Sequence, residues 1–478
     1  MKSHPHTPLP PGVQALHAPW PARRTRLLPA IALCALLSAC AAPPEYVRPD
    51  LAVPAAYKSL PPEAVPAPRA AVRNGEPWWK VFDDPVLDAL IARVDADNQD
   101  LRRIEALARQ ARAAIDAARA NLYPFVGGSA FATRGRQAGT TVDAYGLNAS
   151  VDWEVDLWGR VRSDVAAAEA SAGASDADLA AARLALQAQA AQAYHQLRIA
   201  DAQRQLLTET VASYQRSLEL TRNRVAAGVA TRGDVAQAES QLKNAEAQQL
   251  EVSVARAQLE HALALLTGRA PAELALAEAP MPAQVPIVPA GVPSALLERR
   301  PDVAAAERRV AAANAQLGIA RAAYFPALTL TADGGFRSSR LADLLSLPSR
   351  AWSLGPVLAA SLFDGGARDA VSAQASAAHE ATVAAYRQTV LAAFAEVEDN
   401  LVALTVLADQ ERVQREALAA ARTSLDIATL QYKAGTVSYL SVIVAQTAVL
   451  QSERAALDLR GRRLSASVGL VRAIGGAW

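Results

Sequence analysis

The chemistry that the sequence indicates most clearly is lipid attachment to the thiol of Cys40. A basic segment (23–26) precedes an apolar run of eleven residues (27–37), and the run ends in Leu37-Ser38-Ala39-Cys40. Small residues directly before a cysteine at the end of a secretion signal are typical of lipid-modified proteins. We therefore predict that 1–39 is a lipoprotein signal peptide and that Cys40 carries a covalent lipid. The alternative is an ordinary signal peptide with a chance cysteine.

Processing at Cys40 has two consequences. It removes Cys34, so the mature chain retains one cysteine and forms no intramolecular disulfide. Ala41 follows Cys40, whereas the bacterial lipoprotein pattern that this segment resembles holds proteins in the inner membrane when an aspartate follows. This predicts the outer membrane. No later stretch approaches eighteen uninterrupted apolar residues, so we expect no membrane-spanning helix. The segment before Arg23 is unusually long, which leaves the true translation start open.

Residue patterns typical of enzymes are weak in this chain. The six histidines are scattered, and His379-Glu380 lacks the second histidine of a zinc-binding helix. Arg232-Gly233-Asp234 spells an adhesion tripeptide, but a turn explains it better. The net charge of +1 includes no basic run that would suit nucleic acid. We predict no enzyme activity, no metal, no nucleic-acid partner and no cofactor beyond the lipid on Cys40.

One stretch in a mostly helical sequence has a strand period. From Tyr145 to Leu157 the odd positions are apolar, and from Asn148 onward the even positions are polar. Thirteen residues suffice for a strand that crosses a bilayer at a tilt. Only 5% of the residues are aromatic whereas 51% are hydrophobic, and alanine makes up the difference, which favours long close-packed helices elsewhere. The sequence therefore predicts a mainly α protein with a membrane β-barrel.

The chain contains a long internal repeat. Tyr123-Pro124 matches Phe325-Pro326 at an offset of 202, and Ala227-Gly228 matches Ala434-Gly435 at 207. Each copy is a helix-strand-strand-long helix-helix unit. We expect a helix from Asp84 and Pro85 to about Leu122, and aromatic residues at the strand-helix junctions in an interface belt. The predicted organisation is a proline-rich arm (40–77), a first repeat (78–270; strands 123–136 and 142–157, hairpin 160–267), a linker (271–293) and a second repeat (294–478; strands 325–338 and 351–363, hairpin 367–474).

Four strands cannot close a barrel, and an open sheet edge is not tolerated in hydrocarbon. The protein must therefore oligomerise. Two copies would supply eight strands, with a lumen filled by side chains, and three would supply twelve, enough for a pore; the long helices favour the larger ring. The helix after Gly159 is expected to run about 65 residues, or roughly 100 Å. That length suits an extension through the periplasm.

These features together resemble the TolC-like outer-membrane efflux family, in its lipoprotein branch of OprM or NodT type, over residues 40–478. The resemblance is carried by Trp78-Trp79 with Phe82-Asp83-Asp84-Pro85, by Leu297-Glu298-Arg299-Arg300-Pro301-Asp302-Val303, and by the paired turns at Gly228 and Gly435. It implies a homotrimer with a twelve-stranded β-barrel above a twelve-helix periplasmic α-barrel. It further implies a passive exit channel for solutes, docked through a periplasmic adaptor onto an inner-membrane pump.

The resemblance also suggests site residues at the far turns. Asp234 and Tyr432 match the family's gate positions, with Arg232 as a lesser candidate, and the adaptor-contacting tips would be Gly228, Val229, Gly435 and Thr436. Val437 and Val444 stand where other members carry an arginine and an aspartate, so a charged ring at the second turn is in doubt. Asp234 has an alternative role as an N-terminal helix cap.

Two other functions remain open from the sequence. One is an exit duct for protein secretion, and the other is a periplasmic coiled-coil adaptor lipoprotein without a pore. The sequence does not separate drugs, metals, other small molecules or proteins as cargo, nor does it identify the pump and adaptor.

Overall fold

A computed structural model describes residues 45–59, 77–282, 284–288, 293 and 299–476. The predicted signal peptide, Cys40 and part of the proline-rich arm lie outside these ranges. In chain order the elements are η2 (Trp78–Phe82), α2 (Pro85–Asp97), α3 (Gln99–Ala120), β1 (Phe125–Gln137), β2 (Thr140–Val155), α4 (Arg160–Ala226), α5 (Arg232–Leu266), η3 (Pro271–Glu273), α7 (Pro301–Ala322), β3 (Ala327–Ser338), η4 (Leu341–Asp343), η5 (Leu347–Ser349), β4 (Arg350–Ala359), α8 (Ala367–Ala434) and α9 (Tyr439–Ala473).

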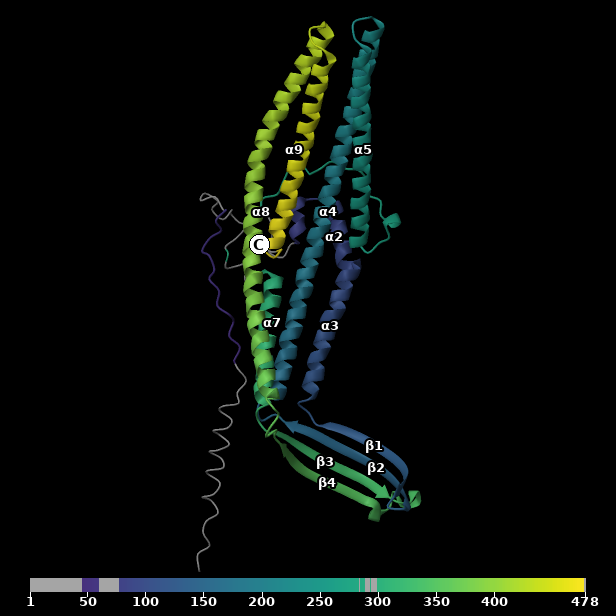
Figure 1. Ribbon diagram of the computed structural model, residues 1–478, viewed down its shortest axis with the longest axis vertical. Coiled ribbons are helices and arrows are strands. Elements are labelled where there is room, and N and C mark those ends of the chain that lie inside the picture. The colour runs from purple at the N-terminus through teal and green to yellow at the C-terminus, as the bar shows by residue number, and fades with distance from the viewer. Residues whose placement is uncertain (1–44, 60–76, 283, 289–292, 294–298, 477–478) are drawn as a thin grey trace, which may run out of the picture.

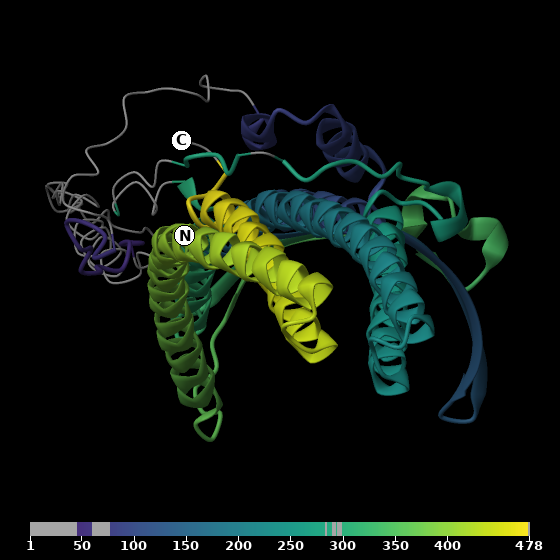
Figure 2. The same cartoon turned by 90° about the horizontal axis from the view of Figure 1, so that it is seen from above.

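The molecule is elongated, with the strands at one end and two helical hairpins at the other (Figure 1). Helices α4 and α8 contain 67 and 68 residues, about 100 Å each, and they extend from the sheet to the hairpin tips. Helices α8, α9, α4 and α5 lie side by side in that order (Figure 1). In the view from above, the N-terminal helical segments and the chain after α5 lie together on one side of these long helices (Figure 2).

The sheet has the order β1-β2-β3-β4, and every neighbouring pair is antiparallel. Its two hairpins come from the two repeats, and β2 pairs with β3 to join them, so the sheet is continuous across the duplication. Strands β1 and β4 are its edges. The fold thus contains the predicted unit twice.

The strand bounds differ by a few residues from the expected ones. β2 begins at Thr140 and ends at Val155, and β4 ends at Ala359, whereas the sequence suggested a strand as far as 363. The last β3–β4 pair is Ala327 with Ala359. Pro326 precedes Ala327, and because proline has no backbone N–H the ladder has no donor there. Residues 360–363 therefore form the connection to α8.

The first helix is broken, which corrects the expectation of one helix from Asp84 to Leu122. Helix α2 ends at Asp97, and Asn98 adopts an extended ψ of 124°. The Asn98 side chain accepts a hydrogen bond from the Leu101 N–H (2.9 Å) and so caps α3. Its Nδ2 donates to the Leu266 carbonyl at the end of α5 (2.8 Å). The break thus fastens the first hairpin to the middle of the molecule.

The described part of the arm lies against the second repeat. The Tyr46 hydroxyl donates to Glu307 of α7 (2.5 Å), and the Glu398 carboxylate of α8 accepts from the backbone N–H groups of Lys58 (2.6 Å) and Ser59 (3.0 Å). Beside it, the main core gathers residues of η2, α2, α4, α7, α8 and α9, among them Trp78 and Tyr194. A separate cluster near the hairpin tips contains Tyr432.

Candidate functional site

The sheet has one polar and one apolar face. Directly paired residues share a face, so the strand register sorts the side chains. On the polar face, Asp333 accepts hydrogen bonds from Asn148 Nδ2 (3.3 Å) and Ser353 Oγ (3.4 Å). The opposite face presents exposed apolar side chains, including Trp352 (78% exposed) and Leu354 (75%). Such a face suits lipid, because in water it would leave a large apolar surface uncovered.

Aromatic side chains occur where strands meet helices, as predicted. Trp153 Nε1 donates to the Leu122 carbonyl (3.0 Å), and Trp158 Nε1 donates to the Pro326 carbonyl (2.6 Å). The rings of Trp158 and Phe325 are stacked with centroids 4.8 Å apart. Tyr123 and Phe363 are 71% and 91% exposed at the two outer junctions. An amphipathic belt at this level fits the polar boundary of a bilayer.

The two hairpin tips share one backbone geometry. Gly228 and Gly435 have φ of 73° and 78°, in the left-handed region that glycine adopts without strain. Val229 N–H donates to the Arg224 carbonyl (2.9 Å), and Thr436 N–H donates to the Gln431 carbonyl (3.0 Å). Val229 is 60% exposed. The duplication therefore places two similar, solvent-exposed corners at the end of the molecule farthest from the sheet.

Asp234 is part of a capping box at the start of α5. Its Oδ2 accepts hydrogen bonds from Thr231 N–H (2.9 Å) and from Thr231 Oγ1 (2.9 Å), and its own N–H donates to Thr231 Oγ1 (3.2 Å). The helix cap that the sequence offered as an alternative is thus present. Arg232 is exposed at the first position of the same helix.

Tyr432 lies away from this box, inside the cluster between the hairpins. Its side chain is 4% exposed, its ring is 5.3 Å from that of Tyr439, and the Arg224 guanidinium lies 4.6 Å from its centroid. Arg224 also donates to the Lys433 carbonyl (3.2 Å). Among the described residues the Tyr432 hydroxyl has no hydrogen-bond partner. The structure therefore does not bring Asp234, Tyr432 and Arg232 into one cluster.

Uncharged side chains link the two hairpins a few helical turns away from the tips, on the side of the sheet. Gln241 of α5 donates to the Tyr214 hydroxyl (3.2 Å) and to Thr447 Oγ1 of α9 (3.0 Å). Gln446 of α9 donates to Ser217 Oγ of α4 (3.1 Å). Sequence reasoning missed these residues and Arg224. A glutamine within an otherwise apolar helical stripe is the signal that would have indicated them.

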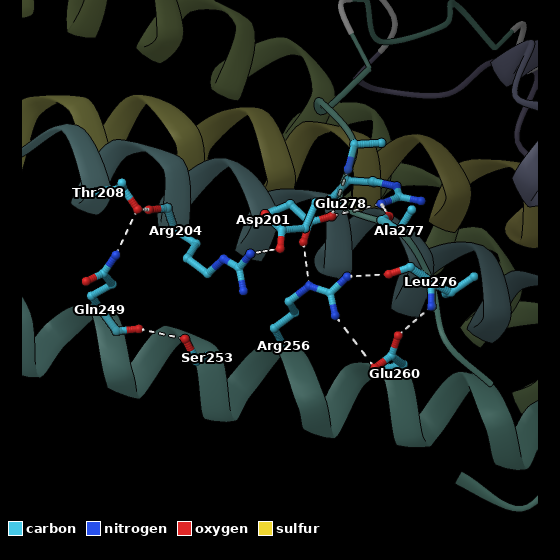
Figure 3. A network of polar contacts seen from close by, with 12 residues as sticks. Asp201, Arg204, Thr208, Gln249, Ser253, Arg256, Glu260, Leu276, Ala277 and Glu278 are labelled. Carbon is cyan, nitrogen blue, oxygen red and sulfur yellow. Dashed lines mark hydrogen bonds and ion pairs between the residues drawn. The ribbon is translucent and has the colours of Figure 1, made fainter. Parts of the chain in front are cut away.

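A buried charge network fastens the chain after α5 to the first hairpin (Figure 3). The Asp201 carboxylate accepts from Arg198 (2.8 Å) on its own helix and from Arg256 of α5 (2.6 Å). Arg198 donates onward to the Ala277 carbonyl (2.7 Å), and Arg256 donates to the Leu276 carbonyl (2.6 Å). We call residues 274–279 the strap. The network joins α4, α5 and the strap into one body.

In the described ranges, no group of three or more histidine, cysteine, aspartate and glutamate side chains is arranged to hold a metal ion.

A separate finding concerns the helices. Within the residues that the structure places, none has the length and apolar character of a membrane-spanning helix.

Known proteins match this chain closely. A family model described as outer membrane efflux protein matches residues 90–269 and 292–476. The pyoverdine export outer membrane protein OpmQ of Pseudomonas aeruginosa is 34% identical over 462 residues, which cover 94% of this chain and 96% of that protein. The antibiotic efflux pump outer membrane protein ArpC of Pseudomonas putida is 33% identical over 468 residues, with coverage of 95% and 96%.

A solved structure shows the same architecture. The outer-membrane channel OprN superimposes with a TM-score of 0.85 at 31% identity, covering 92% of this chain and 100% of that one. The predicted TolC-like duplicated fold and outer-membrane location are confirmed. Because the family model spans both repeats and the relatives match along nearly their whole length, the chain belongs to the outer membrane efflux protein family, the exit channels of efflux systems.

Proposed function

We propose that three copies of this chain form one channel, a twelve-stranded β-barrel continued by a twelve-helix tube, which conducts solutes passively and catalyses no reaction. The observation that carries the trimer is the open sheet, since β1 and β4 each leave one edge unpaired. Unpaired backbone groups are not tolerated in a bilayer. Pairing β1 of one copy with β4 of the next closes the ring.

The helical layer supports the same closure. On α8, five half-exposed apolar residues fall within about 40° of the Val413 direction at 100° per residue. They are Leu391, Val402, Val406, Val413 and Ile427. We call these residues the α8 stripe. Gln414 and Arg422, which hydrogen-bond to α9, lie on another side of the helix.

Helix α5, at the other edge of the layer, presents Leu250, Val254 and Leu265, which are 70%, 59% and 68% exposed. At 100° per residue these three side chains lie within about 60° of one another. Two apolar stripes at opposite edges of one layer fit a head-to-tail ring, in which α8 of one copy packs on α5 of the next.

The partners follow from the place of such a channel in an efflux system. We propose that a periplasmic adaptor contacts the tips at Gly228, Val229, Gly435 and Thr436 and connects them to an inner-membrane pump. Exposure of these four residues supports the assignment. Relatives named for pyoverdine and antibiotic export favour small organic molecules as cargo over proteins. A poreless adaptor lipoprotein fits poorly with two strand pairs in one sheet.

The lipid anchor on Cys40 is part of the same proposal. A lipid-modified Cys40 would tether the arm to the outer membrane. Replacing Cys40 by serine is expected to abolish incorporation of labelled fatty acid and to stop cleavage by the lipoprotein signal peptidase. Normal processing of Cys40→Ser would contradict acylation at this residue.

We further propose that Asp234 and Tyr432, with Arg232 in a lesser role, take part in closing the tips. The capping box uses Asp234 Oδ2 and not Oδ1. The Tyr432 hydroxyl is buried and has no hydrogen-bond partner among the described residues. Asp234 Oδ1 is therefore able to accept a hydrogen bond from a neighbouring copy. The Tyr432 hydroxyl is able to gain a partner when the hairpins move.

The trimeric channel is tested with the purified mature protein. In detergent it should have the mass of three chains by native mass spectrometry, and in planar bilayers it should conduct ions when its tips are opened. A monomeric, water-soluble protein without conductance would overturn the proposal.

A further inference from the structure

The basic residues of the two strand pairs all lie at one end of the sheet. The segments 123–133, 144–159, 326–336 and 351–363 contain no lysine or arginine. The remaining ends of the strands and their connections, 134–143 and 337–350, contain five arginines and two aspartates, a net charge of +3. These residues are Arg134, Arg136, Arg337, Arg340 and Arg350, with Asp143 and Asp343.

Three of the arginines share the apolar face of the sheet. Arg134 and Arg136 follow Val126 at even spacings along β1, and Arg350 has the same relation to Trp352 and Leu354 in β4. We call Arg134, Arg136 and Arg350 the basic rim. Arg337 differs, since the register places it on the polar face, with its guanidinium 5.8 Å from the Phe131 ring centroid.

The rim lies about one bilayer thickness from the helices. Trp153, at the helical end, is level with Pro124, because Phe125 pairs with Asp152. Ten residues separate Pro124 from Arg134. At about 3.4 Å per residue and about 40° of tilt, they span about 26 Å, the height of the apolar band of an outer-membrane barrel. Since the helices form the periplasmic extension, the rim lies at the outer leaflet.

The arginines near this level are exposed and weakly paired. The side chain of Arg134 is 76% exposed and lies 3.4 Å from Asp143, and that of Arg340 is 81% exposed and lies 2.9 Å from Asp343. Exposed ion pairs of this kind hold a side chain only loosely. Between Arg340 and Arg350 the connection also exposes three leucines, Leu341, Leu345 and Leu347, at 64%, 71% and 76%. Arginines flanking exposed leucines suit the boundary of a lipid layer.

We propose that the basic rim binds the phosphate groups of the outer-leaflet glycolipid, the lipid A part of lipopolysaccharide. The proposal rests on the outer-membrane channel described above. The guanidinium fork matches phosphate in a bidentate way, and all five cations here are arginines. Lipid A carries two phosphates on a sugar body above its acyl chains. The rim meets the phosphates, and the exposed leucines contact the sugar and chain boundary.

The experiment uses the full mature trimer in nanodiscs of uncharged phosphatidylcholine, titrated with diphosphoryl lipid A. The test variant is Arg134→Gln/Arg136→Gln/Arg350→Gln. The matched control, Arg216→Gln/Arg222→Gln/Arg415→Gln, removes the same charge from exposed positions on α4 and α8. At roughly fivefold per arginine near an anionic surface, the rim variant should bind about 100-fold more weakly, and the control should bind as the wild type does. The wild type should bind dephosphorylated lipid A more weakly than diphosphoryl lipid A, by the same factor.

Two results would overturn the proposal. One is equal lipid A affinity of the rim variant and the control. The other is wild-type affinity for phosphatidylglycerol equal to that for lipid A, which would make the rim a general anionic surface. The mass and conductance of each sample are measured before titration. A sample that fails to form a trimer or to conduct contradicts the channel, whereas either of the two results above, obtained with an intact channel, contradicts the rim alone.

Discussion

At the hairpin tips, the Asp234 carboxylate has a structural role, and its proposed gating role is separable from it. Thr231→Val removes the hydroxyl of the capping box and retains the carboxylate, so it should cost about 1 kcal/mol of helix stability without changing conductance. Asp234→Ala with Tyr432→Phe should raise single-channel conductance and sensitise cells to large antibiotics. Tyr432→Phe deletes a hydroxyl without a hydrogen-bond partner among the described residues and should not lower stability by itself.

The free energy that such a gate requires matches what polar contacts at the tips can supply. A shift from 1% to 99% open takes about 5.5 kcal/mol, and three symmetric copies of a few weak polar links reach that scale. If the double variant lowers the melting temperature and leaves conductance unchanged, Asp234 is a cap alone and the tips close by other contacts, such as those of Gln241 and Gln446.

His195 gives the core a dependence on pH. Its side chain is fully buried beside the Phe82 ring, 4.7 Å away, and both ring nitrogens lack partners among the described residues. Burial lowers its pKa to about 4, against the weaker opposing effect of Asp84. The unfolded chain, with a histidine pKa of about 6.5, therefore binds more protons between pH 6.5 and 4.

The free energy of unfolding should consequently fall as the pH drops through this window, and His195 should contribute up to about 3 kcal/mol of that loss. The Tyr194 hydroxyl, bonded to Asp84, and the Arg198 guanidinium over the Tyr194 ring are the other polar groups nearby. In urea unfolding at pH 7.5 and 4.5, His195→Gln should lose less stability than the wild type. His261→Gln, at an exposed position of α5, is the control. An equal loss in all three proteins would show that the pKa of His195 is the same in the folded and the unfolded chain.

At the scale of elements, the strap should be the most sensitive connection. The Asp201 side chain is 3% exposed and forms ion pairs with two guanidinium groups, those of Arg198 and Arg256. Asp201→Asn keeps the shape but leaves the buried Arg198 without its carboxylate partner and Arg256 with Glu260, 3.6 Å away, as its remaining one. This should cost about 3–5 kcal/mol and expose residues 274–279 to limited proteolysis. The exposed pair of Asp178 and Arg309 is the comparison, since Asp178→Asn should cost at most about 1 kcal/mol. Equal stability of the two variants would contradict the role of the network.

The elements also show what the sequence could and could not predict. The alternation from Tyr145 to Leu157 and the offset of about 205 residues predicted β2, the sheet and both hairpins, because these patterns are local or repeated. The break at Asn98 was missed, since one polar residue in a helical pattern does not reveal that its amide bonds to Leu266.

The partners of Arg198 and Asp201 were equally hidden. They include backbone groups of the strap, nearly eighty residues away, and no periodicity reports such a contact. Of the three predicted gate residues, only Tyr432 lies between the hairpins. The resemblance supplied Asp234 as a position, whereas its capping box follows from the local run Thr231-Arg232-Gly233-Asp234.

For the whole molecule, the assembly depends on the two edges of the helical layer. The α8 stripe is about half exposed in one chain, and its burial against α5 of a neighbour would stabilise each seam by an amount on the order of 1 kcal/mol per side chain. Threefold symmetry repeats that seam three times. A charge placed in the stripe would be buried without a partner and would oppose assembly at every seam.

Val406→Glu/Val413→Glu should therefore shift the purified protein from trimer to monomer in native mass spectrometry and remove conductance. Each chain should keep its helical circular dichroism, because both positions point away from α9. Arg415→Gln/Ala419→Glu is the matched control. It changes the net charge by the same amount at exposed positions more than 100° around α8 from Val413, and it should remain trimeric. A stripe variant that assembles as well as this control would mean that α8 faces solvent in the channel, and the strand edges alone would then have to hold the three copies together.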